Sequence, residues 1–121
     1  MAGSQVALGC YWLALVIGTH IPSDLPIVPS NGLDKVAHFF AYAVLAGLLS
    51  TVWQLAGGHL FRRQLVFVWL AVAAFGVVDE LTQIPFGREG DALDWLADAA
   101  GAVAGILVFV GIRGWLSPAR D

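Results

Sequence analysis

The sequence has few charged residues and a single cysteine. Only 12% of its 121 residues are charged, whereas 59% are hydrophobic. A soluble domain would carry about 25% charged and about 45–50% apolar residues. So much apolar surface on a short chain cannot all be buried in one water-soluble core, so we expect a membrane protein. The single cysteine, Cys10, cannot form an intramolecular disulfide and indicates nothing about the redox compartment.

Basic residues are also scarce. The net charge is −3 and there is no basic stripe, which argues against a nucleic-acid partner. The first ten residues contain no lysine or arginine, although a cleaved signal peptide normally begins with a basic region. We therefore expect the first apolar run to stay as a helix, with a cleaved signal as the alternative.

Four apolar runs remain, each long enough to cross a hydrocarbon core, which takes roughly 17–25 residues. The predicted spans are residues 5–21, 35–56, 64–84 and 94–115. A proline-rich stretch from Ile21 to Pro29 ends the first run, Gly57-Gly58 ends the second, and Pro85-Phe86-Gly87 ends the third. The sequence therefore predicts an all-α membrane protein, in which residues 1–121 form a single four-helix transmembrane bundle. The five tryptophans are expected mainly at the membrane interface or facing lipid.

The basic residues also predict an orientation. If both termini lie on one side, four arginines share that side and two basic residues lie on the other: Arg62, Arg63, Arg113 and Arg120 against Lys35 and Arg88. Basic residues in short loops favour the cytoplasm, so we expect cytoplasmic termini in a bacterial inner membrane. The acids are distributed more unevenly, because all of them except Asp121 lie at the predicted outer end.

Three predicted helix ends bring polar groups to that outer end. The second helix begins with Asp34, expected as its N-cap, and with Lys35, His38 and Tyr42 on one face; the third ends with Asp79, Glu80 and Gln83; the fourth begins with Asp94 and Asp98. A carboxylate inside a span costs several kcal/mol unless it is paired or reaches water. These acids outnumber the nearby cations, so some must contact water, be protonated or bind a cation.

The same residues carry a family resemblance. The order Lys35-x-x-His38-x-x-x-Tyr42, Asp79-Glu80-x-x-Gln83, Gly87-Arg88 and Asp91-x-x-Asp94-x-x-x-Asp98-x-x-Gly101 resembles the VanZ-like family of small bacterial membrane proteins, over about residues 34–111. Asp98 stands where the family usually has asparagine, which adds a charge here. The resemblance implies a membrane setting and a link to resistance against the glycopeptide teicoplanin, but no defined reaction.

We predict that nine of these residues form a site. The candidate catalytic residues are His38, Asp79, Glu80 and Asp98, and the candidate substrate-binding residues are Lys35, Arg88, Gln83, Asp94 and Tyr42. Each has a structural alternative. His38 is a general base or metal ligand, or else a neutral imidazole bonded to a carboxylate. Arg88 binds a phosphate, or else clamps Asp94 or Glu80 between helices, which we favour. The structural alternative for Lys35 is a side chain that extends to the membrane interface. For Tyr42 it is a packing residue whose hydroxyl is hydrogen-bonded.

A stripe of small residues, Gly101 and Gly105, predicts close packing of the fourth helix, near enough for Asp98 to meet His38. Three functions follow from the pattern. The first is an enzyme that hydrolyses or transfers the headgroup of an envelope lipid or lipid-linked cell-wall precursor. The second is a small carrier or flippase, which with four helices would require an oligomer. The third is an accessory subunit whose charges hold the helix bundle together. There is no His-x-x-x-His pair or cysteine cluster, so a divalent metal stays an open option without a defined site.

Overall fold

The computed structural model describes residues 2–22, 24–27 and 32–117. This part of the chain forms four long helices, α1 (Ala2–Thr19), α2 (Leu33–Gly57), α3 (Arg62–Gln83) and α4 (Ala92–Leu116), and a short 3-10 helix, η1 (Ile84–Phe86). All four long helices have the length and hydropathy needed to cross a membrane. The predicted all-α, four-span fold class is therefore confirmed. Predictions that rested on Pro29, Arg120 and Asp121 fall on residues outside the described ranges.

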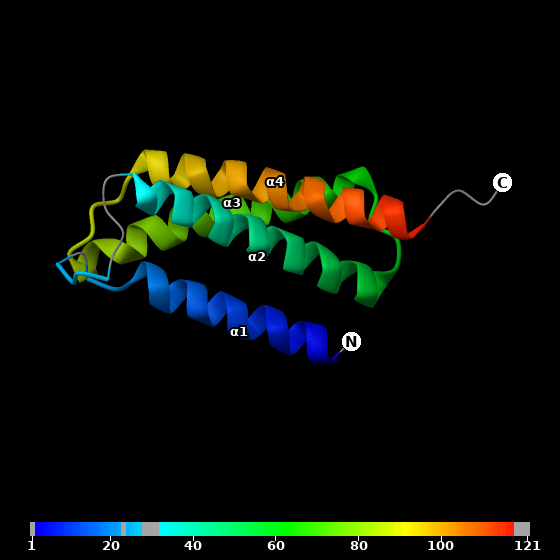
Figure 1. The fold of residues 1–121 in the computed structure, drawn as a ribbon, viewed down its shortest axis with the longest axis horizontal. Coiled ribbons are helices and arrows are strands. Elements are labelled where there is room, and N and C mark those ends of the chain that lie inside the picture. Colours follow the sequence, from blue (N-terminus) through cyan, green and yellow to red (C-terminus); the bar gives the residue numbers. More distant parts are fainter. Residues whose placement is uncertain (1, 23, 28–31, 118–121) are drawn as a thin grey trace.

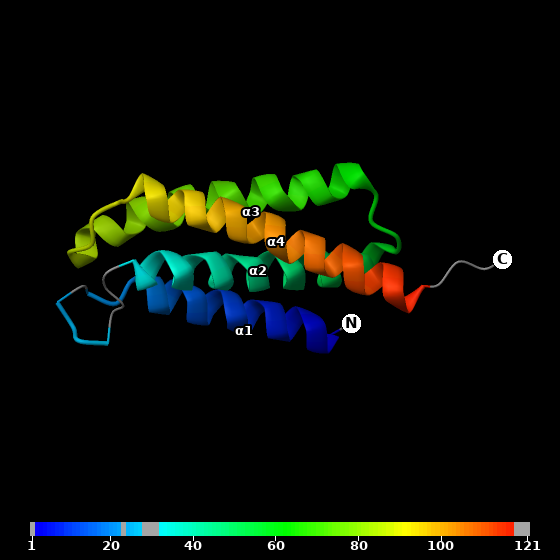
Figure 2. The same ribbon diagram turned by 45° about the horizontal axis from the view of Figure 1, so that its top comes forward.

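The helices run alternately up and down, side by side along the long axis of the molecule (Figure 1). The chain enters α1 and leaves α4 at the same end, whereas the connection between α1 and α2 and the connection between α3 and α4 lie together at the other end (Figures 1 and 2). We call this second end the polar end, because the acids of α2, α3 and α4 occupy it. The exposed surface of the helices is rich in large apolar side chains, as expected for contact with lipid.

The closest helix packing joins α2 and α4. A Cβ atom added to Gly101 would overlap the backbone carbonyl of Phe39, and one added to Gly105 would overlap that of Ala43. Only glycine at these two positions lets the two backbones approach this closely, as in small-xxx-small packing generally. The stripe predicted on the fourth helix thus packs against α2.

Two tryptophans also connect neighbouring helices, in addition to the expected position of this residue type at the interface or facing lipid. The indole nitrogen of Trp69 in α3 donates a hydrogen bond to the carbonyl of Ala99 at 3.1 Å, and that of Trp95 in α4 donates to the carbonyl of Ala73 at 2.9 Å. Both bonds join α3 to α4. An indole N–H inside a membrane needs an acceptor, and a backbone carbonyl of the neighbouring helix supplies it.

Helix α1 is attached more loosely than the others. Its one buried residue is Leu15, and its tyrosine, Tyr11, donates a hydrogen bond to the carbonyl of Ala41 in α2 at 2.8 Å. Two cavities lie along it, one of about 250 Å³ between α1 and α2 near the polar end and one of about 420 Å³ between α1, α2 and α3 farther along. Helices α2, α3 and α4 therefore form the packed core, with α1 beside it.

Candidate functional site

The start of α2 differs from the prediction in one respect. The N-cap of α2 is Gly32, which has a positive φ of 84° and makes no side-chain capping bond, and the helix begins at Leu33. Asp34 is therefore in the first helical turn and is not the N-cap, which corrects the expectation. There its carboxylate still has a physical role, because an acid in the first turn is favoured by the helix dipole.

Lys35 lies among three carboxylates. Its ammonium group donates hydrogen bonds to Asp91 and Asp94, both at 3.0 Å, and lies 3.6 Å from Asp34. Asp91 is also the N-cap of α4 and accepts a hydrogen bond from the amide of Leu93 at 2.8 Å. That amide and then Lys35 hold the pKa of the Asp91 carboxyl below its usual range. Lys35 thus ties the start of α2 to the start of α4.

Asp79 accepts hydrogen bonds from three side chains on three helices. Its Oδ1 atom accepts from Thr19 of α1 at 2.9 Å, and its Oδ2 atom accepts from Tyr42 of α2 and from Gln83 of α3, both at 3.1 Å. The carboxylate is 1% exposed. Each oxygen of Asp79 thus accepts at least one hydrogen bond, and the carboxylate joins α1, α2 and α3 at the polar end. We call this group the Asp79 network.

Glu80 points toward α4. One oxygen, Oε2, accepts a hydrogen bond from the amide of Asp91 at 3.1 Å. The other oxygen, Oε1, is buried, has no hydrogen-bond partner among the described residues and lies 3.7 Å from the Nδ1 atom of His38. The residue as a whole is 6% exposed. Glu80 is therefore a buried carboxylate with one oxygen available.

His38 and Asp98 meet as the glycine stripe predicted. The Nδ1 atom of His38 lies 2.8 Å from Oδ1 of Asp98, and both side chains are buried. The second oxygen of Asp98, Oδ2, is buried without a partner in the described part of the chain. It faces Gly76 of α3, where an added Cβ would lie 3.1 Å away. We call His38, Glu80, Asp94 and Asp98 the His38 cluster.

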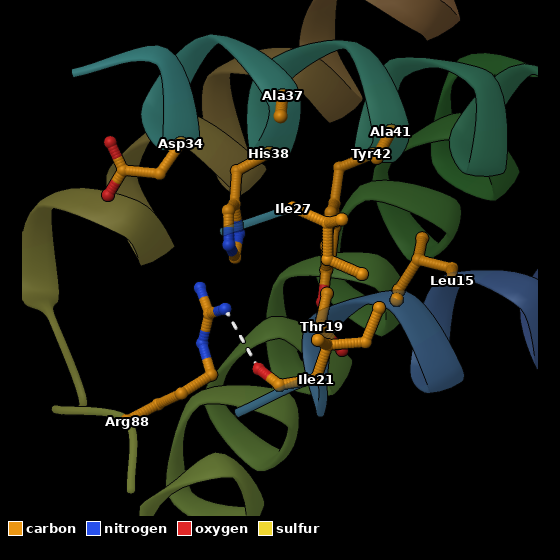
Figure 3. A pocket seen from close by; sticks show the side chains of 11 residues that line it. Leu15, Thr19, Ile21, Ile27, Asp34, Ala37, His38, Ala41, Tyr42 and Arg88 are labelled. Atoms are coloured by element: carbon orange, nitrogen blue, oxygen red, sulfur yellow. Dashed lines mark hydrogen bonds between the residues drawn. The ribbon is translucent and has the colours of Figure 1, made fainter. Parts of the chain in front are cut away.

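Arg88 corrects the interpretation that we favoured. Its guanidinium forms no ion pair with Asp94 or Glu80 among the described residues. It donates a hydrogen bond of 3.4 Å to the backbone carbonyl of Ile21, just after α1. Figure 3 shows the guanidinium facing the imidazole of His38 across the cavity between α1 and α2. The walls of this cavity are mostly apolar and include Leu15, Ile27 and Ala41.

The structure thus divides the nine predicted site residues into three groups. Tyr42 and Gln83 belong to the Asp79 network; Glu80, Asp94, Asp98 and His38 form the His38 cluster, to which Lys35 is attached through Asp94; Arg88 stands alone on the cavity wall. Their catalytic and binding roles stay predictions.

Sequence reasoning missed two residues of the polar end. These residues are Thr19, which donates a hydrogen bond to Asp79, and His20. The Nε2 atom of His20 lies 3.0 Å from the hydroxyl of Thr82, and its Nδ1 atom lies 3.8 Å from Asp79. A signal was present, because Thr19-His20 is a polar pair at the end of the first apolar run, on the same side of the membrane as the acids.

Comparison with known proteins identifies a family. The model of the VanZ/LLP1 family matches residues 6–113, which include all four helices apart from their outermost turns. No curated protein and no solved structure matches the chain. The fold, the polar end and this match agree with the resemblance of the motifs: the chain belongs to the VanZ/LLP1 family and is a VanZ-like membrane protein.

Proposed function

We propose that this protein binds an anionic lipid of the bacterial cell envelope, or a lipid-linked cell-wall precursor, and acts on its headgroup. The observation that carries the proposal is the cavity of about 250 Å³ between α1 and α2, which has Arg88 and His38 on its wall (Figure 3). A lipid with a charged headgroup and an apolar tail matches a cavity that is lined partly by charged or polar side chains and partly by apolar ones.

Arg88 supplies the group that would hold the head. A guanidinium presents five donors in a planar fork that suits phosphate, and the long 3.4 Å bond to Ile21 uses only one of its nitrogens. Farther from Arg88 the lining includes the apolar residues Leu15 of α1 and Ala41 of α2. Polar groups are added to it by Asp34, Thr19 and Tyr42. Because α1 packs loosely, an acyl chain reaches this lining from the surrounding bilayer between α1 and α2.

The His38 cluster supplies the chemistry in this proposal. An imidazole held by a carboxylate through one ring nitrogen is oriented and ready to accept or donate a proton at the other, as general acid–base catalysis requires. His38 has this relation to Asp98 and also lines the cavity. The reaction class that fits is hydrolysis or transfer of the lipid headgroup.

The proposed location is the outer side of the bacterial inner membrane. Among the described residues, Arg62, Arg63 and Arg113 lie at the end opposite the His38 cluster. Arginines near the ends of membrane spans favour the cytoplasm, which supports an outside location for the polar end. A lipid bound there belongs to the outer leaflet.

A second candidate function rests on the Asp79 network. Three donors on one buried carboxylate are what a purely structural lock requires, and this favours an accessory subunit whose charges hold the bundle together. The two functions make different demands on Arg88, because a structural lock has no need of a guanidinium facing a cavity.

The test compares binding of two lipids by the purified protein. In detergent, we expect phosphatidylglycerol to bind and phosphatidylcholine to bind much more weakly, as measured by native mass spectrometry. Replacing Arg88 with alanine removes a charge-assisted hydrogen bond worth about 1.5–3 kcal/mol, which is about ten- to a hundredfold in affinity.

The matched control is Arg62→Ala, which removes the same charge at the opposite end and leaves the preference intact. Turnover is followed by chromatography of the lipid after incubation, and His38→Gln should abolish it while retaining lipid binding. Equal binding of both lipids, unaffected by Arg88→Ala, would contradict the proposed function and favour the accessory subunit.

A further inference from the structure

The His38 cluster contains buried negative charge that no fixed cation balances. Lys35 is shared between Asp34, Asp91 and Asp94. Within the described residues, the recorded ion-pair partner of both Glu80 and Asp98 is His38, which is charged only when it is protonated. Two carboxylates thus share one imidazole at a depth where their side chains are 8% and 0% exposed.

The oxygens of these two acids are also incompletely hydrogen-bonded. Oε1 of Glu80 and Oδ2 of Asp98 are buried without a partner. Buried polar atoms are almost always satisfied in native proteins, and an orphaned carboxylate oxygen costs at least as much as an orphaned neutral acceptor. The Asp79 network, one turn away, shows that this bundle can satisfy a buried carboxylate fully. A positively charged ligand would satisfy these oxygens and balance the charge of both acids at once, whereas a proton would neutralise only one of them.

The geometry matches a metal ion. His38, Glu80 and Asp94 each offer a ligand atom, these atoms lie within 4.8 Å of one another, and all three residues are buried. The Nδ1 atom of His38 faces both Glu80, at 3.7 Å, and Asp98, at 2.8 Å. A tetrahedral ion with bonds of about 2.0–2.2 Å needs ligand atoms about 3.3–3.6 Å apart, so the three side chains must draw closer together when the ion binds.

From this arrangement we infer that the His38 cluster binds one divalent first-row metal ion, with His38, Glu80 and Asp94 as ligands and Asp98 as the adjoining carboxylate. The ligand types decide the class of ion. One imidazole with two or three carboxylates suits Zn²⁺ or Mn²⁺, whereas an all-oxygen set would suit Mg²⁺ or Ca²⁺. A dication places positive charge next to Glu80 and Asp98, which Lys35 does not contact, and shares Asp94 with Lys35.

The site has a defined relation to the cavity. His38 belongs to both, whereas Glu80 and Asp94 lie behind it on α3 and α4. An ion held there adds positive charge on the His38 side of the cavity, opposite the guanidinium of Arg88. The inference stands without the proposed lipid function, because ion binding is measured in the absence of any added lipid.

The experiment titrates chelator-treated protein with Zn²⁺ and with Mn²⁺. The protein is purified in detergent with an affinity tag that contains no histidine, and binding is followed by calorimetry and by elemental analysis after dialysis. We expect one ion per chain. Glu80→Gln keeps the shape of the side chain and removes an anionic ligand, so affinity falls by at least about tenfold. The matched control is Glu89→Gln, the same change on an exposed residue of the neighbouring loop, which leaves affinity unchanged.

X-ray absorption of the zinc-loaded wild type provides a second readout that needs no variant. We expect one imidazole nitrogen and at least two oxygens at about 2.0–2.2 Å. No stoichiometric ion in the wild type, equal affinity in Glu80→Gln, or a shell with no histidine would each overturn the inference. Lost lipid preference with retained ion binding would contradict the proposed function alone, and the reverse result would contradict this inference alone.

Discussion

Asp79 and Glu80 are neighbours in the sequence and are both buried, yet their surroundings differ. Three donors from α1, α2 and α3 satisfy both oxygens of Asp79, whereas Glu80 has one oxygen bonded to the amide of Asp91 and the other without a partner. Successive side chains on a helix point about 100° apart, so one acid faces α1 and α2 and the other faces α4. Two adjacent buried acids therefore differ, because Asp79 accepts hydrogen bonds from three helices and Glu80 has one oxygen without a partner.

The largest expected effect comes from removing the lock. Asp79→Ala leaves the hydroxyls of Thr19 and Tyr42 and the amide of Gln83 buried without their acceptor. We expect a loss of about 3 kcal/mol in the free energy of unfolding, measured as a fall in melting temperature in detergent. Asp24→Ala, which removes an exposed acid, serves as the control. A stable Asp79→Ala protein would show that the network is not a lock.

Neutralising Glu80 should have a smaller effect of opposite sign. In the presence of chelator, Glu80→Gln removes a charge that no fixed cation balances, while a side-chain oxygen remains for the Asp91 amide. Sites built for function are commonly stabilised by such changes, here by about 0.5–2 kcal/mol. The measurement is the same thermal melt. If Glu80→Gln is destabilised as strongly as Asp79→Ala, both acids stabilise the fold, and the proposed difference between them is wrong.

Replacing Asp91 should have the smallest effect on the stability of the fold. Its side chain is more than a third exposed, so its ion pair with Lys35 is screened by water and salt. The pKa of its carboxyl is lowered in the folded protein by the Leu93 amide and then by Lys35. It therefore stabilises the fold above the unfolded-state pKa of about 3.9, and this contribution disappears as the pH falls through the folded-state pKa.

The melting temperature of the wild type should thus fall more steeply than that of Asp91→Asn as the pH decreases from about 5 to about 3. High salt should reduce the difference between the two proteins. Identical curves for the two proteins at low salt would show that the Lys35–Asp91 pair contributes nothing to stability.

The sequence predicts the fold class well, because apolar runs, prolines and glycines are local signals. It also predicts the meeting of His38 and Asp98, since helical spacing and the stripe of Gly101 and Gly105 both point to it. It does not predict that Asp79 is fully hydrogen-bonded whereas Glu80 has an oxygen without a partner. That difference depends on how each helix is rotated about its axis, which tertiary packing decides.

The residues whose contacts the sequence did not predict were missed for other reasons. The partner of Arg88 is a backbone carbonyl, as are the partners of Trp69 and Trp95. Every residue carries such an acceptor, so no residue type in the sequence marks it. Thr19 was overlooked because α1 has a nearly uniform apolar surface, on which one hydroxyl does not stand out as part of a polar face.

The loose attachment of α1 has a consequence for the order of assembly during synthesis. This helix leaves the ribosome first, but its hydrogen-bond acceptors come later: the carbonyl of Ala41 is 30 residues downstream of Tyr11, and the carboxylate of Asp79 is 60 residues downstream of Thr19. Until α3 has entered the membrane, the hydroxyl of Thr19 lacks the carboxylate that accepts its hydrogen bond. The cavity near the polar end, and with it any lipid site, is complete only after Arg88, which follows α3 in the sequence, joins its wall.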